Sequence, residues 1–299
     1  GYTWNISTVK EEMSLEEMHR RMPTAMQRSV SPEAAGTGVD PVRKGFSTLT
    51  QYLVTHEAEN VIEFLKKTFG AEETLRSMGS AGGLHCELKI DDSMLMIGGG
   101  SGHGWKGEDM LGAFHVYVPD CDAVYERAIA AGAKSLQPPT DQPWGERTAN
   151  VDDAAGNHWY IATFKGGNKH EYKSEGAPAI QPYLHPLRAE PVINFLKRAF
   201  GAEESGRYTD PLGVMHHATL KIGTSQFEMG EAQGPYQPMH SMFYLYVPDA
   251  DALYHRAIAA GATTVHEPTD QPYGDRSAAV KDAFGNTWYV ATHIKQIGG

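Results

Sequence analysis

The feature that most constrains this fold is a stretch that the chain contains twice. Residues 153–163 read DAAGNHWYIAT, and residues 282–292 read DAFGNTWYVAT. Gly and Asn tolerate positive φ, while Trp, Tyr, Ile, Val and Thr suit a pleated, half-buried surface. A shorter repeated stretch, Asp141–Arg147 or Asp270–Arg276, leads into each copy. The pattern therefore predicts a β-hairpin with a tight turn, used twice.

The repeat extends well beyond the hairpin. Residues 58–73 read AENVIEFLKKTFGAEE, and residues 189–204 read AEPVINFLKRAFGAEE. Their apolar residues recur at helical spacing, and Gly70 stands where a helix commonly ends. A strand precedes each helix, at Thr48–Thr55 and at Ile180–Pro186, and short strand candidates follow it. Each copy therefore predicts a β-α-β-β-β module.

The same order of elements starts again inside each copy. A strand is predicted at 113–119 and a helix at 122–132, with counterparts at 243–248 and 251–261. Asp122 and Asp251 are suitable N-caps for the two helices. The hairpin then closes each unit, so the chain holds four modules.

Length and spacing suggest a division of the chain. With 299 residues and 40% hydrophobic content, it should form about two domains. We expect an N-terminal extension at 1–45, a first domain at 46–165, a linker at 166–179 and a second domain at 180–299. Ser14, Glu17 and methionines at 18, 22 and 26 predict a short amphipathic helix in the extension.

Composition limits the partners. The net charge is −11, which argues against nucleic acid as a partner. No apolar run approaches the roughly 18 residues of a membrane span, so we expect no membrane partner and a cytoplasmic protein. Cys86 and Cys121 cannot form a disulfide framework and are expected in the core.

The shared motifs resemble those of the PhnB-like branch of the glyoxalase, bleomycin-resistance and extradiol-dioxygenase superfamily, also called vicinal oxygen chelate proteins. The resemblance covers about residues 48–292 and rests on four patterns, each present twice: FLKxxFGAEE, HxxLKI, [WY]G[DE]R and DxxGNxWYxAT. It implies an α+β fold of tandem glyoxalase-like units. In each unit, paired βαβββ modules form a curled mixed sheet, a cup with helices outside and a small-molecule site inside. Two joined units would form a pseudo-dimer within one chain, which could remain monomeric.

The resemblance also implies where a metal would lie. Metal-dependent members take their ligands from the first and last strands of the modules. In the first repeat these positions fall near poor ligands: Thr50, Met96, Ala113 and Tyr160. In the second repeat they fall near Gln181, Glu228, Met242 and Tyr289. Gln181 and Glu228 could thus form an incomplete divalent-metal site in the second domain, to which His217 could add a nitrogen. A structural strand histidine, shared with His85, is the alternative reading of His217.

Each half also carries aromatic side chains and an arginine near its hairpin, which suit a small planar or acidic ligand. The predicted ligand-binding residues are Trp144, Arg147, Tyr160, His217, Tyr273, Arg276 and Tyr289. Alternatively, each arginine pairs with a carboxylate at the hairpin rim. Strand alternation places Trp159 and Tyr160 on opposite faces, so only one of them can face the cup.

Three hypotheses follow. The first is a protein that binds a small aromatic or acidic molecule without a complete metal centre, and the sequence assigns it no cofactor. The second is a metal-dependent lyase, isomerase or dioxygenase acting from the second domain. The third is a scaffold whose first repeat only supports the second. Lids over the cups are expected at Gly98–Trp105 and at Gly230–Met239, which holds Tyr236.

Glu228 distinguishes the two halves, because it replaces Met96 of the first repeat on an apolar strand. A buried carboxylate is costly unless something satisfies it. We therefore expect Glu228 to have a partner, which could be a metal, Arg207, Arg276 or a ligand, and we expect the second cup to be the more active one.

Overall fold

The structure is a computed structural model that describes residues 39–80, 82–166, 172–173 and 176–295. The helix expected near Ser14–Met26 lies outside this range. Residues Val39–Gly299 form one compact unit. Within the described residues, no helix is both long and apolar enough to cross a membrane.

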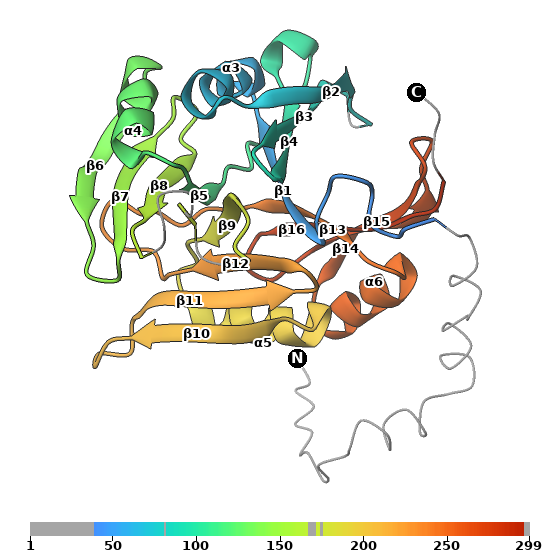
Figure 1. The fold of residues 1–299 in the computed structure, drawn as a ribbon. Coiled ribbons are helices and arrows are strands. Elements are labelled where there is room, and N and C mark those ends of the chain that lie inside the picture. The colour runs from blue at the N-terminus through green and yellow to red at the C-terminus, as the bar shows by residue number, and fades with distance from the viewer. Residues whose placement is uncertain (1–38, 81, 167–171, 174–175, 296–299) are drawn as a thin grey trace, which may run out of the picture. The chain divides into compact units, whose positions relative to one another are not determined.

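The first repeat contains two modules of one helix and four strands each. Its elements are β1 Leu49–Thr55, α3 Ala58–Phe69, β2 Glu72–Met78, β3 Leu84–Ile90, β4 Ser93–Gly99, the 3-10 turn η2 Ser101–His103, β5 Ala113–Tyr117, α4 Cys121–Ala130, β6 Lys134–Asp141, β7 Glu146–Asp152 and β8 His158–Phe164. The predicted order of strands and helices is confirmed (Figure 1).

The second repeat has the same order. Its elements are β9 Ile180–Leu184, α5 Ala189–Phe200, β10 Glu203–Thr209, β11 Met215–Ile222, β12 Ser225–Met229, β13 Met242–Tyr246, α6 Ala250–Ala259, β14 Thr263–Asp270, β15 Asp275–Lys281 and β16 Thr287–His293. Gly70 and Gly201 end α3 and α5 in the left-handed conformation, with φ of 69° and 68°. Glycine adopts this conformation without the strain that a Cβ would cause.

The strands form two eight-stranded sheets, and each sheet takes one module from each repeat. The first sheet runs β14-β15-β16-β13-β1-β4-β3-β2, and the second runs β10-β11-β12-β9-β5-β8-β7-β6. The junctions are the antiparallel pairs β1 with β13 and β5 with β9. In Figure 1 the green β5–β8 accordingly lie beside the yellow β9. Assigning one cup to each repeat was wrong, because an exposed strand edge of one repeat is completed by the other repeat.

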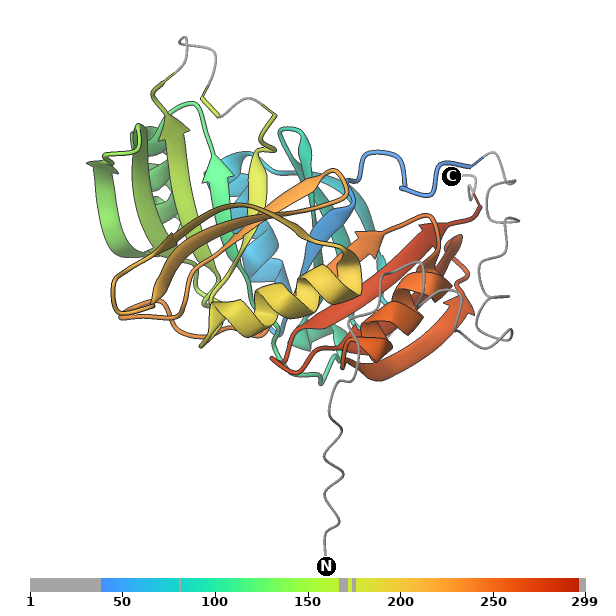
Figure 2. The same cartoon turned by 90° about the horizontal axis from the view of Figure 1, so that it is seen from below.

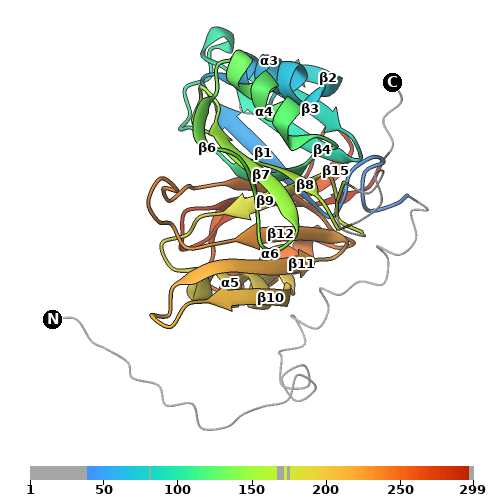
Figure 3. The ribbon, with the colours of Figure 1, turned by 60° about the vertical axis from the view of Figure 1, so that its left-hand side comes forward.

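The hydrophobic cores, by contrast, follow the repeats. Phe64, Phe114 and Trp159 belong to a core built almost entirely from the first repeat, and its counterpart holds Phe243 and Trp288 of the second. Helices α3 and α4 pack together, as do α5 and α6, and Figures 2 and 3 show these pairs outside the sheets. These two large cores are thus local to a repeat, while a smaller cluster of Met96, Tyr244, Tyr246 and Ala291 and each sheet cross between repeats.

The repeated hairpin has the predicted form. Asp153 Oδ1 accepts hydrogen bonds from the backbone N–H groups of Ala155 and Asn157, and its Oδ2 accepts one from the indole N–H of Trp159 at 3.1 Å. Trp159 is fully buried and stacks on Phe114, with ring centroids 4.4 Å apart. The turn aspartate therefore fixes both the turn and the core tryptophan of each repeat.

The N-caps lie two residues earlier than predicted. Asp120, not Asp122, accepts the capping bond from Ala123 N, and Asp249 does the same for Ala252. Asp120 has extended backbone angles that bring its carboxylate to the free N–H groups of the first turn. Asp122 is then free to pair with Arg147.

Candidate functional site

Each sheet turns one face toward the helices and the other toward a cup. We call the cup on the first sheet, built from β1–β4 and β13–β16, the open cup. We call the cup on the second sheet, built from β5–β8 and β9–β12, the closed cup. The two occupy equivalent places in the fold but differ in what fills them.

The open cup holds a cavity of about 890 Å³. This volume lies in the usual range for small-molecule sites. Six aromatic side chains line it: Tyr52, Trp105, Tyr244, Tyr246, Tyr273 and Tyr289. The rings of Tyr244 and Tyr289 are nearly parallel, at 9° and 5.9 Å between centroids. The cavity therefore offers flat walls to a planar ligand.

One polar group of the open cup centres on Glu87, a carboxylate that is only 1% exposed. Arg43 donates two hydrogen bonds to it, one of 2.7 Å. His85 Nε2 lies 3.3 Å from the same carboxylate, and His85 Nδ1 lies 2.8 Å from the hydroxyl of Tyr52. Burial would raise the pKa of Glu87, but the hydrogen bonds from His85 and Arg43 outweigh it and lower that pKa. Glu87 is therefore ionised, and the charge of Arg43 is already compensated.

A second polar group centres on Asp275, also 1% exposed. Its Oδ2 accepts hydrogen bonds from the hydroxyls of Tyr244 at 2.9 Å and Tyr246 at 3.0 Å. Its Oδ1 lies 2.8 Å from Nδ1 of His293. Burial, followed by the charge of Asp275, raises the pKa of both tyrosines. The phenols therefore stay protonated and act as hydrogen-bond donors within the wall.

The closed cup is filled by aromatic side chains. Tyr236, from the loop after β12, stacks on His185 with ring centroids 5.5 Å apart, and its hydroxyl accepts a 3.0 Å hydrogen bond from Asn150. The hydroxyl of Tyr160 lies 3.0 Å from Nε2 of His185. Burial, aided by nearby His158, lowers the pKa of His185 to about 3. His185 is thus neutral, and its hydrogen bond with Tyr160 joins two uncharged groups.

Beneath these rings lies a buried charge pair between the repeats. Glu228 Oε2 of β12 is 3.0 Å from Nδ1 of His115 on β5. Burial opposes ionisation of both groups, but their mutual attraction outweighs it, raising the pKa of His115 and lowering that of Glu228. The expectation that Glu228 has a partner is confirmed. The partner is neither Arg207 nor Arg276, which pair with other carboxylates at the surface.

The donors of the closed cup do not form a metal centre as they stand. Gln181 lies opposite His115 in the sheet register, so both point into this cup with Glu228. However, the oxygen of Gln181 accepts a 2.8 Å hydrogen bond from Gln226, and Glu228 is engaged by His115. Across the described ranges, no group of three His, Cys, Asp or Glu side chains could hold an ion. These residues therefore do not fit a resident metal in this arrangement.

The predicted site residues fall into three places. Tyr273 and Tyr289 line the open cup. Tyr160, His217, Gln181 and Glu228 belong to the second sheet, where His217 Nε2 contacts Thr219 at 3.1 Å. The third group lies at the hairpin rims: Trp144 is 64% exposed, Arg147 pairs with Asp122 and Asp141, and Arg276 pairs with Asp251 and Asp270. The two arginines therefore pair with carboxylates, as the alternative interpretation predicted.

The sequence did not reveal the polar groups of the open cup or the role of His115 in the closed cup. The missed residues are Arg43, Glu87, Asp275, His293 and His115. A difference between the repeats could have pointed to Glu87, because its counterpart in the other repeat is Thr219. In the sheets, Glu87 faces Met96 and Thr219 faces Glu228, so the carboxylate has changed strand between the repeats. His115 and Glu228 belong to different repeats, so no motif within one repeat could have joined them.

Two repeats of βαβββ modules, whose strands pair across the repeats into two mixed sheets, define the class of fold. A family model described as the Glyoxalase/Bleomycin resistance protein/Dioxygenase superfamily matches residues 46–161 and 188–290. The chain belongs to this superfamily.

Three known proteins illustrate what this chain is similar to. An uncharacterized protein of Mycobacterium bovis is 34% identical over 133 residues, which cover 40% of this chain and 86% of that protein. An uncharacterized protein of Mycobacterium tuberculosis is also 34% identical over 133 residues, which cover 77% of that protein. The crystal structure of glyoxalase I from Zea mays matches with a TM-score of 0.61 at 15% identity, covering 81% of this chain and 90% of that one.

Proposed function

We propose that the protein binds a planar aromatic small molecule in the open cup, without a metal ion. The observation that carries this proposal is the cavity of about 890 Å³ with six aromatic side chains in its wall. The positions that the resemblance implies for metal ligands are occupied on the first sheet by Thr50, Met96, Met242 and Tyr289. None of these is a good ligand for a divalent ion.

The charges of the open cup favour a neutral or cationic ring over an acidic one. Glu87 and Asp275 are buried carboxylates in the wall, whereas Arg43 is already paired with Glu87. A cationic ring would also be attracted to the faces of the tyrosines. The proposal therefore narrows the expected aromatic or acidic ligand to an aromatic one.

Fluorescence titration with proflavine, a planar cation, tests this proposal. Tyr289→Ala should weaken binding about tenfold because a flat wall is lost, and Glu87→Gln should reduce the preference for proflavine over 9-anthracenecarboxylate. Tyr160→Phe, at the counterpart of Tyr289 in the closed cup, is the matched control and should leave the affinity unchanged. Equal binding by the parent protein and Tyr289→Ala would refute the assignment to this cup.

A second candidate function is the metal-dependent chemistry of the superfamily, acting from the closed cup. One observation favours it: Glu228, Gln181 and His115 converge there from both repeats. An ion would bind them only by displacing the Glu228–His115 and Gln181–Gln226 hydrogen bonds. Titration with Co²⁺ followed by absorbance tests it. One tightly bound ion that is lost in His115→Ala would support this candidate, whereas no stoichiometric binding would leave the aromatic-binding function alone.

A further inference from the structure

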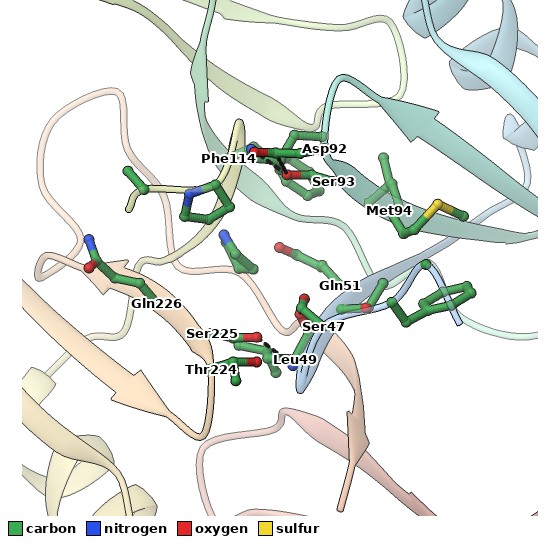
Figure 4. A pocket seen from close by; sticks show the side chains of 18 of the residues that line it. Ser47, Leu49, Gln51, Asp92, Ser93, Met94, Phe114, Thr224, Ser225 and Gln226 are labelled. Carbon is green, nitrogen blue, oxygen red and sulfur yellow. Dashed lines mark hydrogen bonds between the residues drawn. The ribbon is translucent and has the colours of Figure 1, made fainter. Parts of the chain in front are cut away.

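A second cavity, of about 410 Å³, lies between the cores of the two repeats. Its walls come from the starts of β1 and β9 and from the turns at Asp92–Ser93 and Thr224–Ser225 (Figure 4). Leu49 of β1 packs into the core of the second repeat, while Ile180 of β9 packs into that of the first. The cavity therefore belongs to the junction of the repeats and not to either cup.

Most polar groups around this cavity are already used by the fold. Ser225 Oγ accepts a 2.8 Å hydrogen bond from Leu49 N, and Ser93 Oγ accepts a 3.1 Å one from Ile180 N, so the two repeats hold each other in the same way. The ammonium of Lys173 pairs with Asp91 and Asp92. The charge of Lys173 at the cavity is therefore compensated.

Among the described residues that line the cavity, the exceptions are the hydroxyl of Thr50, which lacks a hydrogen-bond partner, and the amide of Gln51. The side chain of Gln51 extends from β1 toward the middle of the cavity in Figure 4 and is 2% exposed. Neither its amide oxygen nor its amide nitrogen has a hydrogen-bond partner in the part of the chain that the structure describes. Two unpaired amide atoms in so buried a place are costly, so residues of this kind normally have a partner.

The other repeat shows that the fold does not require this amide. Pro182 occupies the position of Gln51 on β9 and also lines the cavity, without a polar side-chain atom. The backbone beside Gln51 is, in turn, shaped around it: a Cβ on Gly112 would lie 2.1 Å from Nε2. The amide is thus present in the first repeat only. It fills space that a side chain at position 112 would need.

We propose that this cavity binds a neutral planar ring that carries a lactam edge. A primary amide presents one donor beside one acceptor, and the adjacent N–H and C=O of a cyclic amide complement both. Phe46, Met94, Phe114, Ile180 and Pro182 supply apolar walls for the rest of the ring. A carboxylate is disfavoured, because the ammonium of Lys173 is already paired. This inference does not rest on the function proposed for the open cup.

Isothermal titration of the full chain with 2-quinolinone tests the proposal. The expected result is one site per chain, with N-methyl-2-quinolinone binding about tenfold more weakly because it lacks the donor. Gln51→Leu should weaken 2-quinolinone about tenfold and remove the difference between the two compounds. A thermal melt of Gln51→Leu shows whether the variant folds, and we expect it to be at least as stable as the parent.

Met242→Trp separates this site from the open cup, whose cavity Met242 lines. It should weaken proflavine and leave 2-quinolinone unchanged. Binding of 2-quinolinone that survives Gln51→Leu, or that disappears in Met242→Trp, would overturn the proposal. So would a crystal of the complex in which Gln51 contacts only an ordered water.

Discussion

The two cups show how one fold can hold either a cavity or a packed polar core. In the open cup, Met96 and Tyr244 stand where the closed cup has Glu228 and His115. The open cup keeps its carboxylates, Glu87 and Asp275, in the wall with nearby donors, leaving the centre free. The closed cup places its charge pair centrally and covers it with Tyr236. A buried charge pair needs shielding from competing water and ligands, so the cup that holds one tends to fill.

The largest expected effect comes from giving the open cup the carboxylate of the closed one. Met96 is 2% exposed, and Met96→Glu would bury a second carboxylate opposite Glu87, which already takes up the charge of Arg43. We expect a loss of about 3 kcal/mol in the free energy of unfolding, measured by urea denaturation at pH 7. Adding Tyr244→His, which recreates the pair, should recover at least half of the loss. A single variant as stable as the parent would show that charge is not what separates the cups.

Removing the aromatic cover of the closed cup should have the next largest effect. Tyr236→Ala leaves a gap beside His185 and removes the hydrogen bond from Asn150, so we expect it to cost about 2 kcal/mol. It should also create a second proflavine site per chain. Trp105→Ala, in the corresponding loop of the open cup, is the control and should add none. An unchanged stoichiometry in Tyr236→Ala would mean that this side chain is not what closes the cup.

Acid should destabilise the closed cup through His185. Its pKa of about 3 lies below that of the unfolded chain, so unfolding takes up a proton and stability falls as the pH drops from about 6.5 toward 3. The contribution is at most about 1.4 kcal/mol per pH unit. His185→Val introduces the residue that the open cup has at the corresponding position, Val54. Its free energy of unfolding should fall less than that of the parent between pH 7 and pH 5. Parallel pH profiles would contradict this role.

The smallest effect concerns the two hairpin aromatics at corresponding positions. Tyr273 lines the open cup, whereas Trp144 is 64% exposed and donates to Glu146. Tyr273→Ala should weaken proflavine about threefold, and Trp144→Ala should not change its affinity. Both should alter stability by only about 0.5 kcal/mol, which thermal melts can check. A larger binding loss for Trp144→Ala would place a ligand at the closed cup.

Much of the fold was predictable because its signals are local. The repeated DxxGN turn, the helical periodicity of α3 and α5 and the glycines that end them each act within a dozen residues. The separation of Trp159 and Tyr160 to opposite faces also follows from strand alternation and is confirmed. The caps were misplaced because two aspartates compete within one turn, and only Asp120 has the extended backbone that a cap needs.

The amino-acid sequence by itself determined the repeat, the order of strands and helices and the core of each repeat, since these depend on contacts close in sequence. Only the tertiary structure decided which modules share a sheet. The pairing of β1 with β13 and of β5 with β9 brings His115 to Glu228 and Tyr52 toward Tyr289, over separations that no local pattern encodes. The reason is physical: a strand edge can pair with any edge of matching register, so pairing depends on how the whole chain buries its faces.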